Sequence, residues 1–308
     1  MDVTVKESQD LEKVARLFEQ HRDTPFTYLT NIPLVKMLSQ LESFKIFVAE
    51  VNGETVGCIH SLSYIYDCGY IGGLLVHKDF RGKGVGRRLL NAALNSLNTG
   101  HVYLFVEEKN TIAVRLVEKT GFKNIYKGRR YIVITPINEA FPRSPTITTD
   151  VDWLSLKESI GFNERNGVVN IGYYPVKVTE KTFEDLRVDN KILRCGNVIA
   201  IIEYSYGVTV GDHLYTFNDH IVRKLRDIDM TRRVVEVNPF YIEPRPEDLV
   251  RIVNYLLSTG EVYVKTYEGD PVANRLPLTG RTGALVMEYE KGILVVFDIK
   301  LTIFPVFS

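Results

Sequence analysis

The residues with the clearest chemical potential form one basic, glycine-rich stretch, Arg81-Gly82-Lys83-Gly84-Val85-Gly86. Glycines leave backbone N–H groups uncovered, and Arg81, Lys83 and the following Arg87 add positive charge around them. If a helix begins here, its first amides and its macrodipole also attract negative charge. The stretch therefore predicts a site for a pyrophosphate-sized anion. A tight turn with only a structural role is the alternative.

The flanking residues supply the elements that such a site needs. An apolar run at Ile71–Val76 predicts a strand before the turn. After the turn, one helical stripe is formed by Leu89, Leu90, Ala93, Leu94 and Leu97. The order is thus strand, glycine turn, helix. A Rossmann fingerprint would need glycine where Arg87 stands, and the Lys-Ser/Thr pair of a Walker loop is absent.

The stretch VHKDFRGKGVGRRLL resembles the central motif of the GNAT superfamily of CoA-dependent N-acyltransferases. That motif, Gln/Arg-x-x-Gly-x-Gly/Ala, is matched by Arg81, Gly84 and Gly86. Residues 101–122 resemble the family's next segment of strand, asparagine, helix and Gly-Phe ending, with Asn110 at the asparagine position. Together the two motifs are far more specific than either alone, and the resemblance extends over about residues 1–137.

The resemblance implies an α/β fold with a mixed sheet, and a site for acetyl-CoA. It implies that backbone groups of Leu74, Leu75 and Val76 bond the acetyl carbonyl and the pantetheine arm. It further implies that residues 81–87 hold the pyrophosphate and that Asn110 bonds the pantetheine. Asn110 could instead only cap the helix that follows it. The reaction would be direct attack of an amine on the thioester, with the oxyanion held by the N–H of Val76.

The sequence departs from the family at both positions that commonly transfer protons. Val117 stands where a tyrosine acid is frequent, and Phe105 stands where some members have a glutamate base. Glu107 lies two residues beyond Phe105, on the same face of the strand, and is the candidate general base. It could equally be a solvated carboxylate. Tyr126 is the candidate acid, although packing at a sheet edge is its simpler role.

The second half repeats part of the first. With a shift of 160 residues, residues 99–116 align with 259–276 and are identical at eight of eighteen positions. The repeat predicts a tandem, GNAT-like second domain. In the ungapped alignment, residues 81–86 fall on 241–246, where glycine is absent and Glu243 adds negative charge, and Asn110 falls on Asp270. We therefore expect CoA to bind only the first half. The alternative is a chance repeat with another fold in the second half.

Length and composition set the remaining bounds. A chain of 308 residues suggests two domains, at 1–140 and 151–308, joined by a linker at 141–150 that is rich in proline and threonine. Its 38 basic and 38 acidic residues cancel, which favours neither nucleic acid nor an anionic membrane as partner. No apolar run approaches a membrane span. The three cysteines form no C-x-x-C pair, so we expect free thiols, no metal site and a cytoplasmic protein.

The resemblance therefore implies an acetyl-CoA-dependent N-acetyltransferase that acts on a primary amine, either a small molecule or a protein amine. The degenerate second domain would cover the substrate cleft or support the fold and a homodimer. Two alternatives remain open at this point. One is a non-catalytic acyl-CoA-binding or regulatory module, which the changes at Phe105 and Val117 favour, and the other is a scaffold that binds neither substrate.

Overall fold

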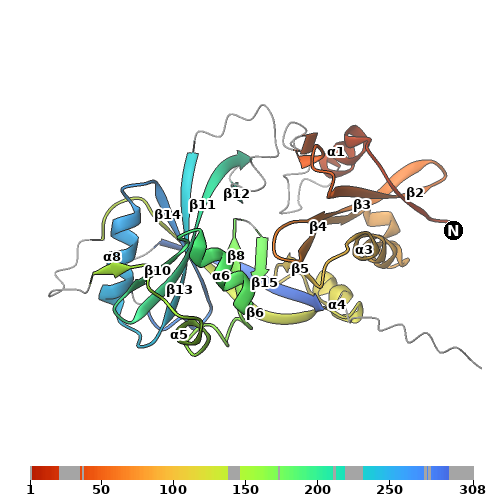
Figure 1. Ribbon diagram of the computed structural model, residues 1–308. Coiled ribbons are helices and arrows are strands. Elements are labelled where there is room, and N and C mark those ends of the chain that lie inside the picture. Colours follow the sequence, from red (N-terminus) through yellow and green to blue (C-terminus); the bar gives the residue numbers. More distant parts are fainter. Residues whose placement is uncertain are drawn as a thin grey trace, which may run out of the picture.

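The structure is a computed structural model that describes residues 2–20, 35–36, 38–137, 146–172, 174–210, 213–218, 232–273, 276 and 279–290. Two lobes lie side by side and share one large mixed sheet (Figure 1). This arrangement confirms the predicted α/β class with a mixed sheet. None of the helices in the described ranges has the length and apolar character needed to cross a membrane.

The first lobe includes the strand, glycine turn and helix that the sequence predicts, followed by the strand and helix expected at 101–122. It contains β1 (Thr4–Glu7), α1 (Leu11–Glu19), β2 (Phe44–Val51), β3 (Glu54–Ser63), β4 (Cys68–Val76), α3 (Val85–Ser96), β5 (His101–Val106), α4 (Thr111–Lys119) and β6 (Lys123–Val133). Asn52 and Gly53, both with positive φ, form the two-residue turn between β2 and β3. The apolar stripe of α3 is buried against β2, β3 and β4, as its periodicity predicts.

The second lobe is larger in strand content. It contains β7 (Ile147–Thr148), α5 (Trp153–Lys157), β8 (Val168–Ile171), β9 (Tyr174–Lys177), α6 (Glu180–Val188), β10 (Ile192–Cys195), β11 (Val198–Val210), β12 (His213–Asn218), β13 (Arg232–Tyr241), α8 (Pro246–Leu256), β14 (Glu261–Tyr267) and β15 (Thr279–Glu290). Its core is formed where α8 covers β10, β11, β13 and β14.

The two lobes contain the same central unit. In the first lobe β4, α3 and β5 follow one another, and β4 pairs in parallel with β5. In the second lobe β13, α8 and β14 have the same order and the same parallel pairing. In the loop after each second strand, a polar side chain caps the next helical turn in the same way. Asn110 Oδ1 accepts from the N–H of Ala113 at 3.2 Å, and Asp270 Oδ1 accepts from the N–H of Ala273 at 2.7 Å.

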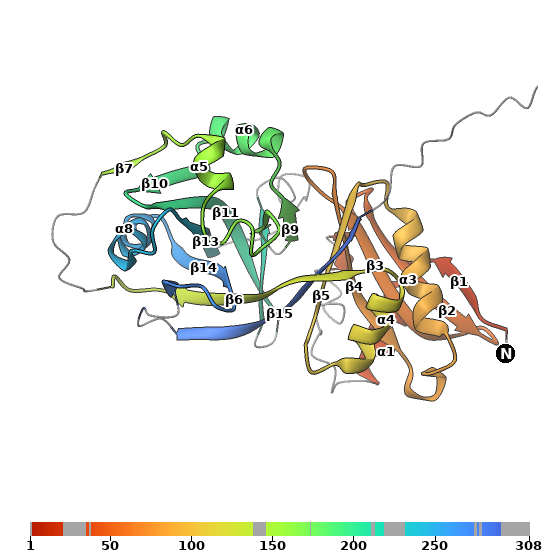
Figure 2. The same cartoon turned by 90° about the horizontal axis from the view of Figure 1, so that it is seen from below.

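Two strands are exchanged between the lobes. The strand order at the junction is β5-β15-β6-β14, so β15 from the end of the described chain lies beside β5 of the first lobe. In return, Gly128–Val133 of β6 pairs with β14 of the second lobe. The strands β6 and β15 also pair with each other along most of their length, and Figure 2 shows both running between the lobes. Each lobe's part of the shared sheet is therefore completed by a strand from the other half of the chain.

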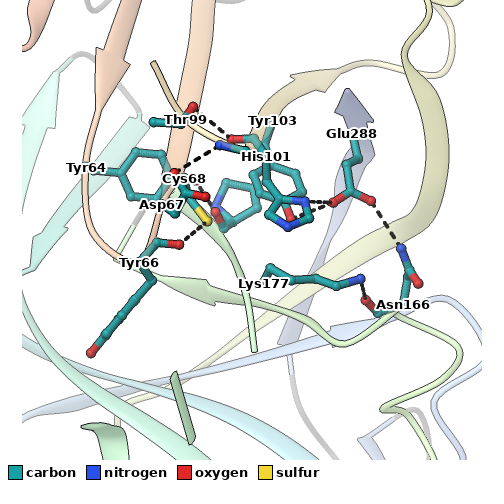
Figure 3. A network of polar contacts seen from close by, with 12 residues as sticks. Tyr64, Tyr66, Asp67, Cys68, Thr99, His101, Tyr103, Asn166, Lys177 and Glu288 are labelled. Atoms are coloured by element: carbon teal, nitrogen blue, oxygen red, sulfur yellow. Dashed lines mark hydrogen bonds and ion pairs between the residues drawn. The ribbon is translucent and has the colours of Figure 1, made fainter. Parts of the chain in front are cut away.

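A buried polar network joins the lobes where β15 enters the first sheet (Figure 3). Glu288 Oε1 accepts from the Tyr103 hydroxyl at 2.8 Å and lies 2.9 Å from Nδ1 of His101. Glu288 Oε2 accepts from the Asn166 amide at 3.1 Å. Burial disfavours the charged form of Glu288, but the hydrogen bonds from His101 and Tyr103, together with the positive charges of Lys177 and His101, outweigh burial and lower its pKa. The carboxylate is thus held by residues from both lobes.

Some predictions lie partly or wholly outside the described residues. The sequence also favours a helix at 31–42, of which residues 31–34 and 37 lie outside the described part, and a strand at 293–297, which lies wholly outside it. Of the expected linker at 141–150, residues 141–145 lie outside, and Ile147–Thr148 forms β7 beside β10. Cys58, Cys68 and Cys195 are buried free thiols. Among the described residues there is no group of three or more His, Cys, Asp or Glu that could hold a metal ion.

Candidate functional site

The candidate site is a wedge between β4 and β5. The two strands pair only from Cys68 to Tyr70, opposite His101 to Tyr103. Beyond Tyr70 they separate, although β4 continues to Val76 and β5 to Val106. The separation leaves a pocket with a cavity volume of about 100 Å³ between them. An open edge of a parallel pair exposes backbone groups to a ligand that enters the gap.

A bulge in β4 shapes one wall of the wedge. Cys58 of β3 lies opposite Leu75, and His60 lies opposite Gly72, so β4 has one more residue than β3 between these pairs. Gly73, within this bulge, has φ +64°. Gly72, Gly73 and Leu74 all line the pocket. The predicted carbonyl-binding backbone at 74–76 therefore begins where the strand bends, and neither this bulge nor the two glycines was singled out from the sequence.

The glycine turn lies between the end of β4 and α3. Gly82 and Gly84 have φ values of +74° and +82°, and a side chain at either position would point into open space. Gly84 is the N-cap residue of α3 and makes no side-chain cap hydrogen bond. Arg81 Nε donates to the carbonyl of Val76 at 3.0 Å, which folds the turn over the end of the strand. The turn thus presents a bare helix N-terminus, as the sequence predicts.

Side chains of the turn and of α4 complete the surroundings. Lys83 Nζ lies 5.3 Å from the centroid of the Phe80 ring, in the 3₁₀ helix η2 (Lys78–Phe80). Gly86 lies close to α4, because a Cβ there would be 3.2 Å from a methyl group of Leu116. The close packing of Gly86 brings the start of α3 next to α4.

Two polar candidates lie on the pocket wall. Glu107 follows β5 directly, is exposed and lines the pocket. Asn110 also lines it, and its Oδ1 caps α4. Since Oδ1 is engaged by the helix, the amide N–H₂ is the part of Asn110 that remains to donate to a ligand. Both residues therefore line the wedge, although Glu107 lies just after the strand on which the sequence placed it, and their roles stay predictions.

The predicted acid, Tyr126, is not among the residues that line the pocket. It lies on β6, is buried in the apolar cluster at the lobe junction, and interacts with the side chain of Asn170. Burial raises the pKa of its hydroxyl to about 12. Val117 lies in the pocket wall and is itself buried. The position of Tyr126 gives its predicted role no support, and proton donation at the position of Val117 is not available.

A larger hollow, with a cavity volume of about 450 Å³, lies between α1, the β2–β3 hairpin and η2. Several of its charged side chains are paired with neighbours. Lys13 lies 3.8 Å from Asp10, and Arg16 lies 3.5 Å from Glu12. The wedge, although smaller, is lined by the strand bulge, by both polar candidates and by Leu90 of α3, the helix that begins at the glycine turn.

In the second lobe the corresponding wedge is filled by the chain itself. The N–H of Ile160 donates to the carbonyl of Tyr241 at 2.7 Å, and the N–H of Tyr241 donates to the carbonyl of Ile160 at 3.1 Å. The buried Arg165 donates to the carbonyl of Pro239, and its guanidinium lies 4.0 Å from the centroid of the Phe240 ring. The free edge of β13 is therefore already bonded.

The connection before α8 corrects the ungapped alignment. The pairing of Cys68 with His101 in the first lobe corresponds to that of Val234 with Glu261 in the second, a shift of 166 residues in one strand and 160 in the other. The connection between strand and helix is accordingly shorter, at 242–245 in place of 77–84. The alignment was therefore wrong before the helix. The absence of glycine remains, and Glu243 in this connection binds Arg245 at 2.8 Å.

Comparisons with known proteins place this geometry in context. Residues 11–122 match the acetyltransferase (GNAT) family. An N-alpha-acetyltransferase of Sulfurisphaera tokodaii is 30% identical over 118 residues, which are 33% of this chain and 71% of the relative. An uncharacterized N-acetyltransferase of Methanocaldococcus jannaschii is 31% identical over 121 residues, which are 38% of this chain and 74% of the relative. A solved GCN5-related N-acetyltransferase of Sphaerobacter thermophilus covers 94% of this chain and 97% of its own, with 15% identity and a TM-score of 0.51. At that identity the structural likeness concerns the fold alone.

Proposed function

Because the chain belongs to the acetyltransferase (GNAT) family, we propose that its first lobe transfers an acetyl group from acetyl-CoA to an amine by direct attack on the thioester. The observation that carries the proposal is the bare N-terminus of α3, capped by Gly84 at the open end of the β4–β5 wedge. An anion bound there delivers whatever is attached to it directly into the gap between the strands.

Coenzyme binding uses main-chain groups for most of its contacts. The amides at Gly82–Gly86 hold the pyrophosphate, and Arg81, Lys83 and Arg87 supply charge. The pantetheine arm then lies along Leu74, Leu75 and Val76 as a strand-like partner for β4. The Asn110 amide donates to the arm from the opposite wall. Polar side chains are scarce in this arrangement because backbone groups do the binding.

The chemistry needs few further groups. Glu107 takes a proton from the substrate ammonium, and the free amine attacks the carbonyl carbon. A backbone N–H of β4 stabilises the oxyanion of the tetrahedral intermediate. Because the arm runs from the turn toward Tyr70, this donor lies nearer to Leu74 than to Val76, where the sequence put it. When the intermediate collapses, the C–S bond breaks and CoA leaves as a thiolate, which is stable enough to depart without an acid at Val117. The products are the N-acetylated amine and free CoA.

For the second lobe we propose a duplicated GNAT-like domain, about residues 151–308, that has no coenzyme site. The repeated strand–helix–strand unit supports the duplication. The bonded edge at Tyr241 and the buried Arg165 support the loss of the site, because a pantetheine arm would need the same backbone groups. One coenzyme per chain is the expected stoichiometry.

Calorimetry with acetyl-CoA tests the proposal, paired with release of free CoA over a panel of amines. Wild-type protein is expected to bind one equivalent. Gly84→Asp is expected to abolish binding, because it adds a negative charge and a strained side chain at the helix N-terminus. Gly53→Asp is the matched control, since Gly53 also has φ +82° and an unobstructed Cβ direction but lies in the β2–β3 turn. Binding by both variants would contradict the proposed site.

A second candidate function follows from Phe105 and Val117, which replace the common proton-transfer residues of the family. A non-catalytic acyl-CoA-binding module would bind acetyl-CoA at the same turn. It would show binding that is lost in Gly84→Asp, but no CoA release with any amine. Turnover that falls strongly in Glu107→Gln with unchanged coenzyme affinity would exclude the binding module and assign the base.

A further inference from the structure

The closed end of the wedge is formed by two aromatic rings. Tyr70 is the last residue of β4 that pairs with β5, and its partner there is Tyr103. Phe105 lies two residues further along β5. The two ring centroids lie 5.8 Å apart, and both residues line the pocket. The rings therefore bridge the strands at the point where the gap between them begins.

Other rings hold Tyr70 in position. The ring centroid of His60 lies 5.9 Å from that of Tyr70, and the Phe44 ring stacks on His60 with a centroid distance of 5.2 Å. Tyr174, on β9 of the second lobe, lies 5.2 Å from Tyr70 in an edge-on arrangement. Tyr70, His60 and Tyr174 are each less than 5% exposed. These closely packed side chains support Tyr70 on the side away from the pocket and hold its ring at the pocket wall.

The direction of the coenzyme makes this end of the wedge the acyl end. The phosphate turn lies beyond Val76, at the open end, and the strands meet at Tyr70. An arm that starts at the turn and runs along β4 approaches the closed end with its sulfur and acyl group last. Each additional methylene of the acyl chain then moves toward the two rings.

We propose that Tyr70 and Phe105 form the floor of the acyl site and restrict the transferred group to short chains such as acetyl, with Tyr174 of the second lobe as a positioning residue for Tyr70. The inference rests on the proposed function. It also gives the second lobe a part in the reaction of the first, because the floor is fixed from the other half of the chain.

The test compares the dissociation constants of CoA, acetyl-CoA, butyryl-CoA and hexanoyl-CoA by calorimetry, so that no acceptor amine is needed. In the wild type, affinity is expected to fall from acetyl to hexanoyl. A methylene that finds apolar room contributes roughly fourfold in affinity. Phe105→Ala is therefore expected to reverse the order and raise the hexanoyl-to-acetyl affinity ratio on the order of tenfold or more. Phe105→Leu, a milder change, should shift the ratio in the same direction.

Two further variants distinguish a specific floor of the acyl site from a general loosening of the fold. Phe47→Ala removes a buried ring from the apolar cluster around α3, outside the pocket lining, and should leave the ratio unchanged. Tyr174→Ala should raise the ratio by a smaller factor, which a purely structural role would not do. Equal affinity of the wild type for all chain lengths would overturn the floor while leaving the acetyl-CoA site intact. No binding of any thioester would contradict the proposed function and this inference with it.

Discussion

The Tyr241 hydroxyl lies 3.0 Å from Oδ1 and 3.2 Å from Oδ2 of Asp270, and donates a hydrogen bond to this buried carboxylate. The contact spans the wedge of the second lobe, from the end of β13 to the helical turn after β14. Asp270 also accepts from the N–H groups of Val272 and Ala273. One carboxylate thus closes the gap that in the first lobe remains open beside Asn110.

Asp270→Ala is expected to reduce the free energy of unfolding by about 2–4 kcal/mol, since it leaves a buried hydroxyl and two amides without their acceptor. Asn110→Ala removes the equivalent but exposed cap and should cost about 1 kcal/mol. Urea titrations of both variants give the comparison. Equal effects would mean that the Tyr241 contact contributes nothing beyond capping.

The exchange of β6 and β15 predicts that neither half folds well alone. A fragment of residues 1–137 lacks the partner for β5, and a fragment of residues 146–308 lacks the partner for β14. Each is expected to aggregate, because an unpaired strand edge is exposed. Co-expressed, the fragments should form a 1:1 complex on size-exclusion chromatography. A stable monomeric 1–137 fragment would contradict this prediction.

Glu288→Gln tests the polar junction. The variant is expected to lose about 1–3 kcal/mol of stability at pH 7, because an amide cannot accept equally from His101, Tyr103 and Asn166. The pKa of Glu288 is lowered in the folded protein, so its contribution is present above the usual value of 4.5 and is lost as the pH falls through the lowered pKa. Wild type and variant should therefore converge in stability at low pH. Glu290→Gln, at an exposed position of β15, is the control and should change little at either pH.

The buried His60 should cause a second pH effect on stability, at higher pH than the effect of Glu288. Burial lowers the pKa of His60 to about 3 from the usual 6.5. Below pH 6.5 the unfolded chain therefore binds a proton that the folded protein does not. As the pH is lowered, the free energy of unfolding falls with a limiting slope of about 1.4 kcal/mol per pH unit. His60→Gln should remove this slope between pH 6.5 and 5 in denaturant titrations, whereas His77→Gln, in the turn after β4, should retain it.

The local parts of the fold and site could be predicted from the sequence because short-range patterns determine them. The glycine turn follows from Gly82 and Gly84, where positive φ is needed, and α3 follows from a stripe that includes Leu89 and Ala93. The bulge at Gly73 leaves no comparable pattern, because it depends on how β4 pairs with β3.

Long-range features had no signal in the sequence. The place of β15 beside β5 joins residues far apart in the chain, and nothing near Glu288 indicates that His101 is its partner. Arg165, in a polar segment, has the character of a surface residue, yet it is 1% exposed and fills the second wedge. Only the packing of distant segments determines such roles.

The strand exchange also constrains how the protein is made. The sheet of the first lobe remains unfinished until the residues of β15 have been synthesised, so this lobe leaves the ribosome with an open edge. The first lobe should therefore depend on chaperones and be sensitive to premature termination, although all of its own residues are synthesised long before β15.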